Sequence, residues 1–230
     1  MGRVLVMGDI HGNLTAFNQC MERSQFDSNV DTLIQLGDVA DRYENTAQVV
    51  EELLKIPNLI AIRGNHDVWV MNWLLTNKIE TVWVNNGGKE TISSYEKLAA
   101  HRIPEHKKFF TEIQQDSYTD SQNRIFVHGG FTHPKAPKFD LIKTQCHWDR
   151  SLLEAAVIGE KLGKKPTILS GFNEIYIGHT KTLVWSTDQP INIYNLWDMD
   201  TGAGSNGRLS IMDIETKELW QSDQVGPGIL

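Results

Sequence analysis

Five short apolar runs, each followed by glycine and polar residues, constrain the fold of this chain more than any other feature of its sequence. Runs of this kind, rich in β-branched residues and bounded by turn residues, are typical of buried strands. In an open α/β sheet, ligands bind where the strands end, so the residues after these runs are expected to converge on one site. The runs and the sequences that follow them are residues 3–7 with GDIHG, 32–36 with GDVADR, 59–62 with RGNHD, 124–127 with HGG and 175–177 with GHT.

The side chains at these five strand ends carry oxygen and nitrogen donors that suit a divalent metal ion. A single Gly-Asp is usually a turn or a helix cap, and an isolated histidine is usually a core or surface residue. Five turns could equally use Ser, Asn or Pro, so donors at every one of them favour a metal centre over a purely structural role. Asp9 and His11 are two residues apart and would point to the same side of extended chain.

The segments between the first strands have the pattern of helices. Residues 14–23 (LTAFNQCMER) and 45–55 (NTAQVVEELLK) space their apolar side chains as amphipathic helices do. Strands that alternate with helices through residue 67 predict an α/β fold. After residue 179 the chain is expected to form antiparallel strands, over residues 192–196, 208–214 and 218–221, with a tight turn between the last two.

Residues 68–122 break this alternation and are interpreted as a helical cap beside the site, within a single domain that covers residues 1–230. Helices are expected over residues 68–76 and 106–115. The large aromatic side chains of this region are interpreted as core packing rather than as substrate contacts. They are Trp69, Trp73, Phe109 and Phe110.

Composition and charge exclude several classes of protein. The net charge of −7 argues against nucleic acid as the main partner, because nucleic-acid-binding proteins usually carry a basic surface. No apolar run approaches the ~20 residues of a membrane-spanning helix. The first expected strand begins at Arg3, which leaves no room for a cleavable leader, and two cysteines form no disulfide framework. A cytoplasmic protein without a membrane partner is therefore expected.

The order and spacing of GDIHG, GDVADR, GNHD, HGG and GHT resemble the motifs of the phosphoprotein phosphatase superfamily of metallophosphoesterases. The resemblance runs from Val4 to about Gly207. It includes the segment WVNNGG, which begins at Trp83 and is followed by Thr91 and by Ser94 before Tyr95. This segment resembles the region between the third and fourth motifs of bacterial and phage protein phosphatases.

Two positions depart from the common pattern of the family. Tyr43 follows Arg42 where many members have Gly, and Asp67 follows His66 where eukaryotic members usually have Glu. Neither departure removes a catalytic group. Both point toward the bacterial branch, so the chain is expected to be of the bacterial or phage type.

The resemblance implies an α/β fold of the calcineurin-like metallophosphoesterase kind, in which two mixed sheets flanked by helices pack face to face. It also implies two divalent metal ions. Asp38 would bridge them, because a carboxylate has two oxygens and can span ions ~3.5–4 Å apart. A ligand set without thiolate favours Mn²⁺, with Fe or Zn²⁺ as alternatives. The remaining ligands implied are Asp9 and His11 for the first metal and Asn65, His128 and His179 for the second.

The same resemblance implies how the reaction would proceed. A hydroxide bridging the two metals would attack phosphorus in line, without a phosphoenzyme intermediate. His66 would protonate the leaving alkoxide as a general acid. Asp41 would hydrogen-bond His66 and favour its protonated form; the alternative for Asp41 is a helix N-cap ahead of Ala47.

Arginine side chains are expected to hold the phosphate, because the planar guanidinium can bind it through two hydrogen bonds. The resemblance assigns this role to Arg42. Arg150, in the sequence HWDR, resembles the Trp-x-Arg element of bacterial members; the alternative is a plain surface pair with Asp149. Arg63 is expected to be a structural ion-pair partner. Three histidines without motif context are expected to be solvated: His101, His106 and His133.

The leading functional hypothesis is a metal-dependent phosphomonoesterase, most simply a serine/threonine protein phosphatase. Its partner would be a phosphoprotein or a small phosphorylated substrate. The alternative enzyme is a hydrolase of bis(5′-nucleosyl) tetraphosphates, whose members share all five motifs. A non-catalytic scaffold with this fold would lack ligands or His66, and this chain has all of them. The physiological substrate, the native metal and the oligomeric state are left open.

Overall fold

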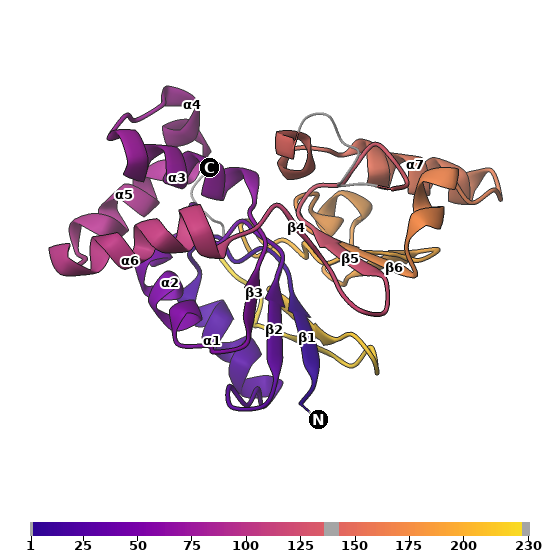
Figure 1. Ribbon diagram of the computed structural model, residues 1–230, viewed down its shortest axis with the longest axis horizontal. Helices are drawn as coiled ribbons and strands as arrows, with labels where there is room; N and C mark the ends of the chain where they lie inside the picture. The colour runs from indigo at the N-terminus through magenta and orange to yellow at the C-terminus, as the bar shows by residue number, and fades with distance from the viewer. Residues whose placement is uncertain (1, 136–142, 227–230) are drawn as a thin grey trace.

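The computed structural model of the chain describes residues 2–135 and 143–226. In this part of the chain two five-stranded sheets lie face to face (Figure 1). The first sheet has the strand order β10-β9-β1-β2-β3 and the second the order β4-β5-β6-β8-β7. Both sheets mix parallel and antiparallel pairs, and helices flank them, which confirms the predicted fold class.

The bounds of the elements are as follows. The first sheet contains β1 (Val4–Met7), β2 (Thr32–Gln35), β3 (Leu59–Ala61), β9 (Ser210–Asp213) and β10 (Leu219–Gln221). The second contains β4 (Ser117–Thr119), β5 (Arg124–Val127), β6 (Glu174–Ile177), β7 (Ile191–Ile193) and β8 (Leu196–Asp198). The longer helices are α1 (Leu14–Arg23), α2 (Thr46–Leu54), α3 (Asn65–Thr76), α5 (Lys89–Glu96), α6 (Ile103–Lys108) and α7 (Ser151–Lys161). Shorter helical segments are α4 (Thr81–Trp83), η1 (Val84–Gly88), η2 (Ala100–Arg102), η3 (Phe109–Ile113), η4 (Lys143–His147), η5 (Thr167–Gly171) and η6 (Thr182–Trp185).

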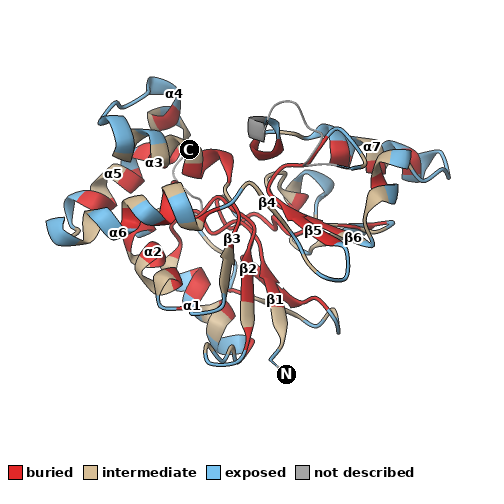
Figure 2. Cartoon of the chain, viewed as in Figure 1, coloured by how far each residue is buried: buried red, intermediate tan, exposed pale blue. Residues whose placement is uncertain are grey.

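The apolar side chains form three layers of core. Side chains alternate between the two faces of β1. Leu5 and Met7 pack toward the helices, while Val6 packs against residues of the other sheet such as Phe126 and Tyr176. Helices α1 to α6 lie on the side of the first sheet and α7 on the side of the second, and their buried residues face the sheets (Figures 1 and 2). No helix in the described part of the chain is long and apolar enough to cross a membrane.

Parallel pairing brings the strand ends that carry the motifs to one edge. In the first sheet β1, β2 and β3 run parallel, and in the second β5, β6 and β8 do. The carboxyl ends of parallel strands lie at the same edge of a sheet. Because the two sheets face each other, the loops that follow all these strands meet at one end of the molecule.

The helices between the third and fourth motifs form one insertion whose two ends lie side by side. The chain leaves the first sheet after β3 and returns at Gln115. The backbone N–H of Arg63 donates to Gln115 O at 2.9 Å, and that of Gln115 donates to Ala61 O at 2.9 Å. The Gln114 side chain reaches Asp67 at the start of α3, with Nε2 2.8 Å from Oδ2. The insertion is thus fastened where it begins.

One expectation about local structure is wrong, and two others are only partly met. Residues 192–196 do not form one strand: β7 and β8 are a hairpin that turns at Tyr194, whose φ is +57°. Helix α3 begins at Asn65 rather than near residue 68, because Gly64 caps it and Asp67 accepts the Gly64 N–H at 2.9 Å. Trp69 is only half-buried and lines the cavity beside the motifs, whereas Phe109 and Phe110 are core residues as predicted.

One of the three histidines expected to be solvated, His106, is instead buried. Its Nδ1 lies 3.1 Å from Tyr95 Oη and its Nε2 lies 2.9 Å from Glu51 Oε1. Glu51, on α2, also accepts two hydrogen bonds from the Arg102 guanidinium, at 2.8 and 2.6 Å. These contacts tie α6 and the segment before it to α2.

We expect Glu51→Gln to destabilise the protein at neutral pH, and to do so less in acid. The hydrogen bonds from Arg102, and then those from His106, lower the pKa of Glu51 to about 2. A carboxyl group whose pKa is lower in the folded than in the unfolded protein stabilises the fold when it is ionised. For Glu51 this stabilisation is fully present above the unfolded pKa, near 4.5, and is lost as the pH falls toward 2. Because Glu51 is partly exposed and its interactions are screened by water, the substitution should lower the free energy of unfolding at pH 7 by about 1 kcal/mol, which corresponds to about 2–4 °C in Tm.

Thermal unfolding followed by circular dichroism at pH 7 and at pH 3 checks this expectation. Glu105→Gln is the matched control, because Glu105 pairs with the same arginine but is exposed. A Tm difference between Glu51→Gln and the wild type that stays the same at both pH values would contradict the linkage.

Candidate metal centre

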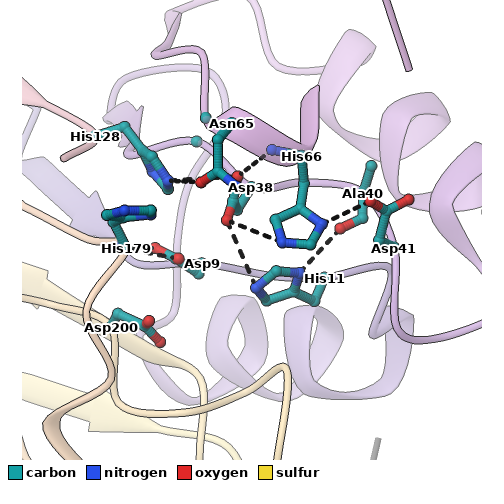
Figure 3. A network of polar contacts seen from close by, with 12 residues as sticks. Asp9, His11, Asp38, Ala40, Asp41, Asn65, His66, His128, His179 and Asp200 are labelled. Atoms are coloured by element: carbon teal, nitrogen blue, oxygen red, sulfur yellow. Dashed lines mark hydrogen bonds and ion pairs between the residues drawn. The ribbon is translucent and has the colours of Figure 1, made fainter. Parts of the chain in front are cut away.

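The five motifs meet in one buried cluster, as the sequence predicts. Asp9 follows β1, Asp38 follows β2, and Asn65 begins the helix after β3, while His128 follows β5 and His179 follows β6. Figure 3 shows these side chains pointing toward one another from both sheets. Asp9 and Asp38 are each 2% exposed and His128 is fully buried. The face-to-face packing of the sheets thus assembles a site that neither sheet contains alone.

Tight backbone turns bring the carboxylates close to neighbouring loops. Asp38 has a φ of +52° and lies directly against Gly64: a Cβ on Gly64 would be 2.1 Å from Asp38 Oδ1. Gly178 approaches Asp9 in the same way, and a Cβ there would also be 2.1 Å from a carboxylate oxygen. Both glycines are required because any side chain would displace a predicted ligand.

The histidines present unprotonated nitrogens to the centre of the cluster. His11 Nδ1 is 2.9 Å from Ala40 O, and His128 Nδ1 is 2.8 Å from Leu36 O. A carbonyl oxygen only accepts, so each Nδ1 carries the proton and each Nε2 is left with a lone pair for a metal ion. His179 Nε2 is buried without a hydrogen-bond partner among the described residues. A buried acceptor nitrogen without a partner is costly unless a metal ion completes it.

Asp38 lies at the middle of the cluster. Its Oδ2 is 3.7 Å from His11 Nε2, and its Oδ1 is 3.4 Å from His128 Nε2. The atoms that could hold a metal ion fall into two groups within the described residues, His11 with Asp38 and His66, and Asp38 with His128 and His179. Asp38 belongs to both groups. This arrangement fits two metal ions that share one carboxylate.

The electrostatics of the cluster also fit cations. Burial, together with the nearby His66, lowers the pKa of His11 to about 3, and burial together with His128 lowers that of His179 to about 3. Both rings are therefore neutral and able to ligate. Burial raises the pKa of Asp9 well above its usual range, and the neighbouring Asp200 and Asp38 add to the shift. A group of buried carboxylates that repel one another is stabilised by divalent ions.

His66 and Asp41 form a second buried pair beside the ligands. His66 Nδ1 is 2.6 Å from Asp41 Oδ2, and the backbone N–H of His66 donates to Asp38 Oδ1 at 2.9 Å. Burial disfavours the imidazolium, but the carboxylates of Asp38 and Asp41 outweigh it and raise the pKa of His66. The alternative role for Asp41 has no support, since the N-cap residue of α2 is Asn45.

Two arginines reach the same cavity, which has a volume of about 260 Å³. Arg42 lines it, and its guanidinium makes no hydrogen bond or ion pair within the described residues. Arg150 lines it as well and donates to Thr180 Oγ1 at 2.7 Å rather than pairing with Asp149, which accepts the N–H of Leu152 at the start of α7. Arg63 instead pairs with Asp116 at 2.9 Å, away from the cavity, as predicted.

Several side chains that line the cavity were not assigned to it from the sequence; besides the four described next, they include Asn86 and Ser205. Asp200 follows β8 just as Asp9 follows β1, and the apolar run before it was the available signal. Figure 3 shows Asp200 beside Asp9. Lys181 follows the last motif by two residues. Trp69 and Trp148 form the wall, with their ring centroids 5.2 Å apart in an edge-to-face contact.

Comparisons with known proteins agree with the fold. The calcineurin-like phosphoesterase family matches residues 2–194. Serine/threonine-protein phosphatase 1 of Salmonella typhimurium is 25% identical over 220 residues, which cover 92% of each chain. The symmetrical bis(5′-nucleosyl)-tetraphosphatase of Haemophilus ducreyi is 30% identical over 87 residues, 34% of this chain and 32% of the relative.

Two solved structures share the fold. A protein serine/threonine phosphatase from Saccharomyces cerevisiae superposes with a TM-score of 0.62 at 16% identity and covers 97% of this chain and 80% of its own. A metallophosphoesterase from Sphaerobacter thermophilus gives a TM-score of 0.58 at 16% identity, with 98% and 89% covered.

The two sheets and the family match define a metallophosphoesterase, a hydrolase of phosphoric esters. The chain belongs to the calcineurin-like phosphoesterase family.

We expect Asp38→Asn to weaken the binding of both metal ions, because it removes the charged side chain common to the two groups. Loss of a shared ligand should raise the Kd for Mn²⁺ at least about 100-fold, the upper range found for outer-shell changes. Elemental analysis after dialysis against a limiting Mn²⁺ concentration measures this. Arg42→Ala is the control and should keep its metal. Wild-type metal content in Asp38→Asn would refute the shared role.

Proposed function

We propose that the chain is a two-metal phosphomonoesterase that removes phosphate from phosphoserine and phosphothreonine in proteins. The observation that carries the proposal is the extent of the likeness to a serine/threonine-protein phosphatase, which covers 92% of both chains. The match to the tetraphosphatase relative covers 34% of this chain. A cytoplasmic location is part of the proposal and rests on the sequence alone.

The metal ligands in this proposal are the buried side chains that meet at the strand ends. Asp38, which belongs to both groups of potential ligands, would serve both ions. The other ligands in this proposal are Asp9 and His11 for the first ion and Asn65, His128 and His179 for the second, and these side chains lie around Asp38. The nitrogen and oxygen donors favour Mn²⁺, with Fe or Zn²⁺ as the alternatives. Such ions supply hydroxide at neutral pH by lowering the pKa of water toward ~7.

The remaining residues bind the phosphate and supply a proton. Arg42, after β2, and Arg150, directly before α7, both line the cavity and would hold the phosphate oxygens. His66, with Nδ1 bound to Asp41, has Nε2 left to donate a proton to the leaving oxygen; this nitrogen is 4.0 Å from Asp38 Oδ2. Asp41 fixes the ring and favours the imidazolium that the step requires.

A nucleotide hydrolase is the second candidate, and one observation favours it. Trp148 is 45% exposed and stands at the wall of the cavity next to Trp69. An exposed indole can stack on a nucleobase as readily as on part of a peptide. The substrate therefore has to be tested directly.

We expect metal-stripped protein to lose activity toward p-nitrophenyl phosphate and Mn²⁺ to restore it. With Mn²⁺ present, kcat/KM for a phosphoserine or phosphothreonine peptide should exceed that for diadenosine tetraphosphate by at least about tenfold. A panel of these substrates, with p-nitrophenyl phosphate as the common reference, measures both expectations. Preference for the dinucleotide would replace the proposed substrate by the second candidate, and full activity in metal-free protein would exclude both.

We expect His66→Asn to keep its metal and lose about 10²–10⁴-fold in kcat on phosphoserine peptide. The alkoxide of serine is a poor leaving group and needs the proton. The loss on p-nitrophenyl phosphate should be much smaller, because nitrophenolate leaves without protonation. Steady-state kinetics on both substrates provide the measurement, with metal content determined on the same samples. Equal losses on the two substrates would remove the general-acid role.

A further inference from the structure

The segment WVNNGG with Thr91, which resembles a feature of bacterial and phage protein phosphatases, contributes no metal ligand. Its Trp83 and Thr91 are nevertheless almost completely buried, at 1% and 0% exposure. Both side chains lie against the loop that carries Asp41 and Arg42, although the sequence separates them from Asp41 by 42 and 50 residues. These long-range polar contacts raise the question of what the segment does for the site.

The Asp41 carboxylate is surrounded by donors from this segment. Trp83 Nε1 lies 2.9 Å from Oδ1 and 3.0 Å from Oδ2, and Thr91 Oγ1 lies 2.7 Å from Oδ1. His66 Nδ1 contacts Oδ2 at 2.6 Å. An indole N–H can only donate, so Trp83 donates to the carboxylate and keeps Oδ2 directed toward His66.

The Thr91 hydroxyl bonds to Asp41 twice. Besides donating to the carboxylate, its oxygen accepts the backbone N–H of Asp41 at 2.9 Å. Thr46 Oγ1 lies 3.0 Å away and must be the donor in that contact, because the one hydroxyl hydrogen of Thr91 is already used. Side chain and backbone of Asp41 are thus fixed together, although its φ of +77° is unfavourable for a residue with a side chain.

The same segment also fixes the backbone of the neighbouring arginine. The N–H of Arg42 donates to Gly87 O at 3.1 Å. Gly87 has a φ of +98°, and a Cβ there would lie 2.6 Å from Arg42 N, so only glycine permits this approach. Gly88 lies flat against the Trp83 ring, where a Cβ would come within 2.6 Å of it.

We propose that Trp83 and Thr91 are positioning residues that hold Asp41 in the orientation His66 needs to donate its proton. This inference rests on the proposed role of His66 as the general acid. Trp83 and Thr91 act through Asp41 and do not line the cavity, whereas Asn86 of the same segment does. Trp83 and Thr91 therefore serve the chemical step, and their loss should leave metal binding and substrate affinity unchanged.

The test uses variants that each remove one polar group. Thr91→Val deletes the hydroxyl at constant size, and Trp83→Phe deletes the indole N–H. Each should lower kcat on phosphoserine peptide by about tenfold, the effect of one hydrogen bond to a charged group, and change kcat on p-nitrophenyl phosphate by less than about twofold. KM and metal content should stay as in the wild type. Thr91→Ser restores the hydroxyl and should restore the peptide rate.

Trp73→Phe is the matched control. Its indole belongs to the same insertion and contacts the Trp83 ring at 5.5 Å between centroids, but it makes no hydrogen bond to Asp41. It should leave the ratio of the two rates unchanged. In an Asp41→Asn background, Thr91→Val should have no further effect on that ratio, because its effect passes through Asp41.

The outcomes separate this inference from the function it rests on. If His66→Asn discriminates between the two substrates while Thr91→Val and Trp83→Phe reduce both rates equally, or neither, the positioning role is overturned and the general acid stands. If His66→Asn itself shows equal losses, the general-acid role fails and the positioning role fails with it. Circular dichroism on every variant identifies a loss of both rates that comes from unfolding, and Thr91→Ser then decides whether the hydroxyl matters.

Discussion

The site depends on one carboxylate, Asp38, which is 2% exposed and surrounded by three imidazoles. Burial by itself would raise the pKa of this carboxyl, but the imidazoles around it, His128 and His66 first, lower it well below the usual range. An ionised group so far from water needs partners on every side. Loops from both sheets supply them, so the position of Asp38 fixes where each other motif has to lie.

The contacts that bring the motifs together around Asp38 also couple the site to the packing of the sheets. His128 follows a strand of the second sheet, yet its Nδ1 binds Leu36 O beyond β2 of the first. The backbone N–H of His179 likewise reaches across to the Asp9 carboxylate, at 3.1 Å from Oδ2. Apolar residues of both sheets form the core directly beneath these bonds. The sheets are therefore held at their open edge by the same residues that would ligate metal ions.

Sequence reasoning located the strand ends because their signal is local: an apolar run, a glycine and a donor side chain. It failed where a structural feature depends on a residue far away in the sequence, or on a turn that lacks the usual turn residues. The β7–β8 hairpin turns at Tyr194 and Asn195, without the glycine that usually marks such turns, and so Asp200 beyond it was missed. His106 is buried because Glu51, 55 residues away, accepts its hydrogen bond. No pattern around His106 indicates that partner.

The insertion that starts at α3 and ends at Gln115 returns to the strand it left, and two backbone hydrogen bonds close the junction. The distance between its ends does not depend on its length. Recombination could therefore replace the insertion by another one without changing the register of either sheet. One restriction applies. A replacement must bring its own donors for the Asp41 carboxylate, which binds to this insertion rather than to the sheets. A single piece of chain thus carries both His66 and the donors that hold Asp41.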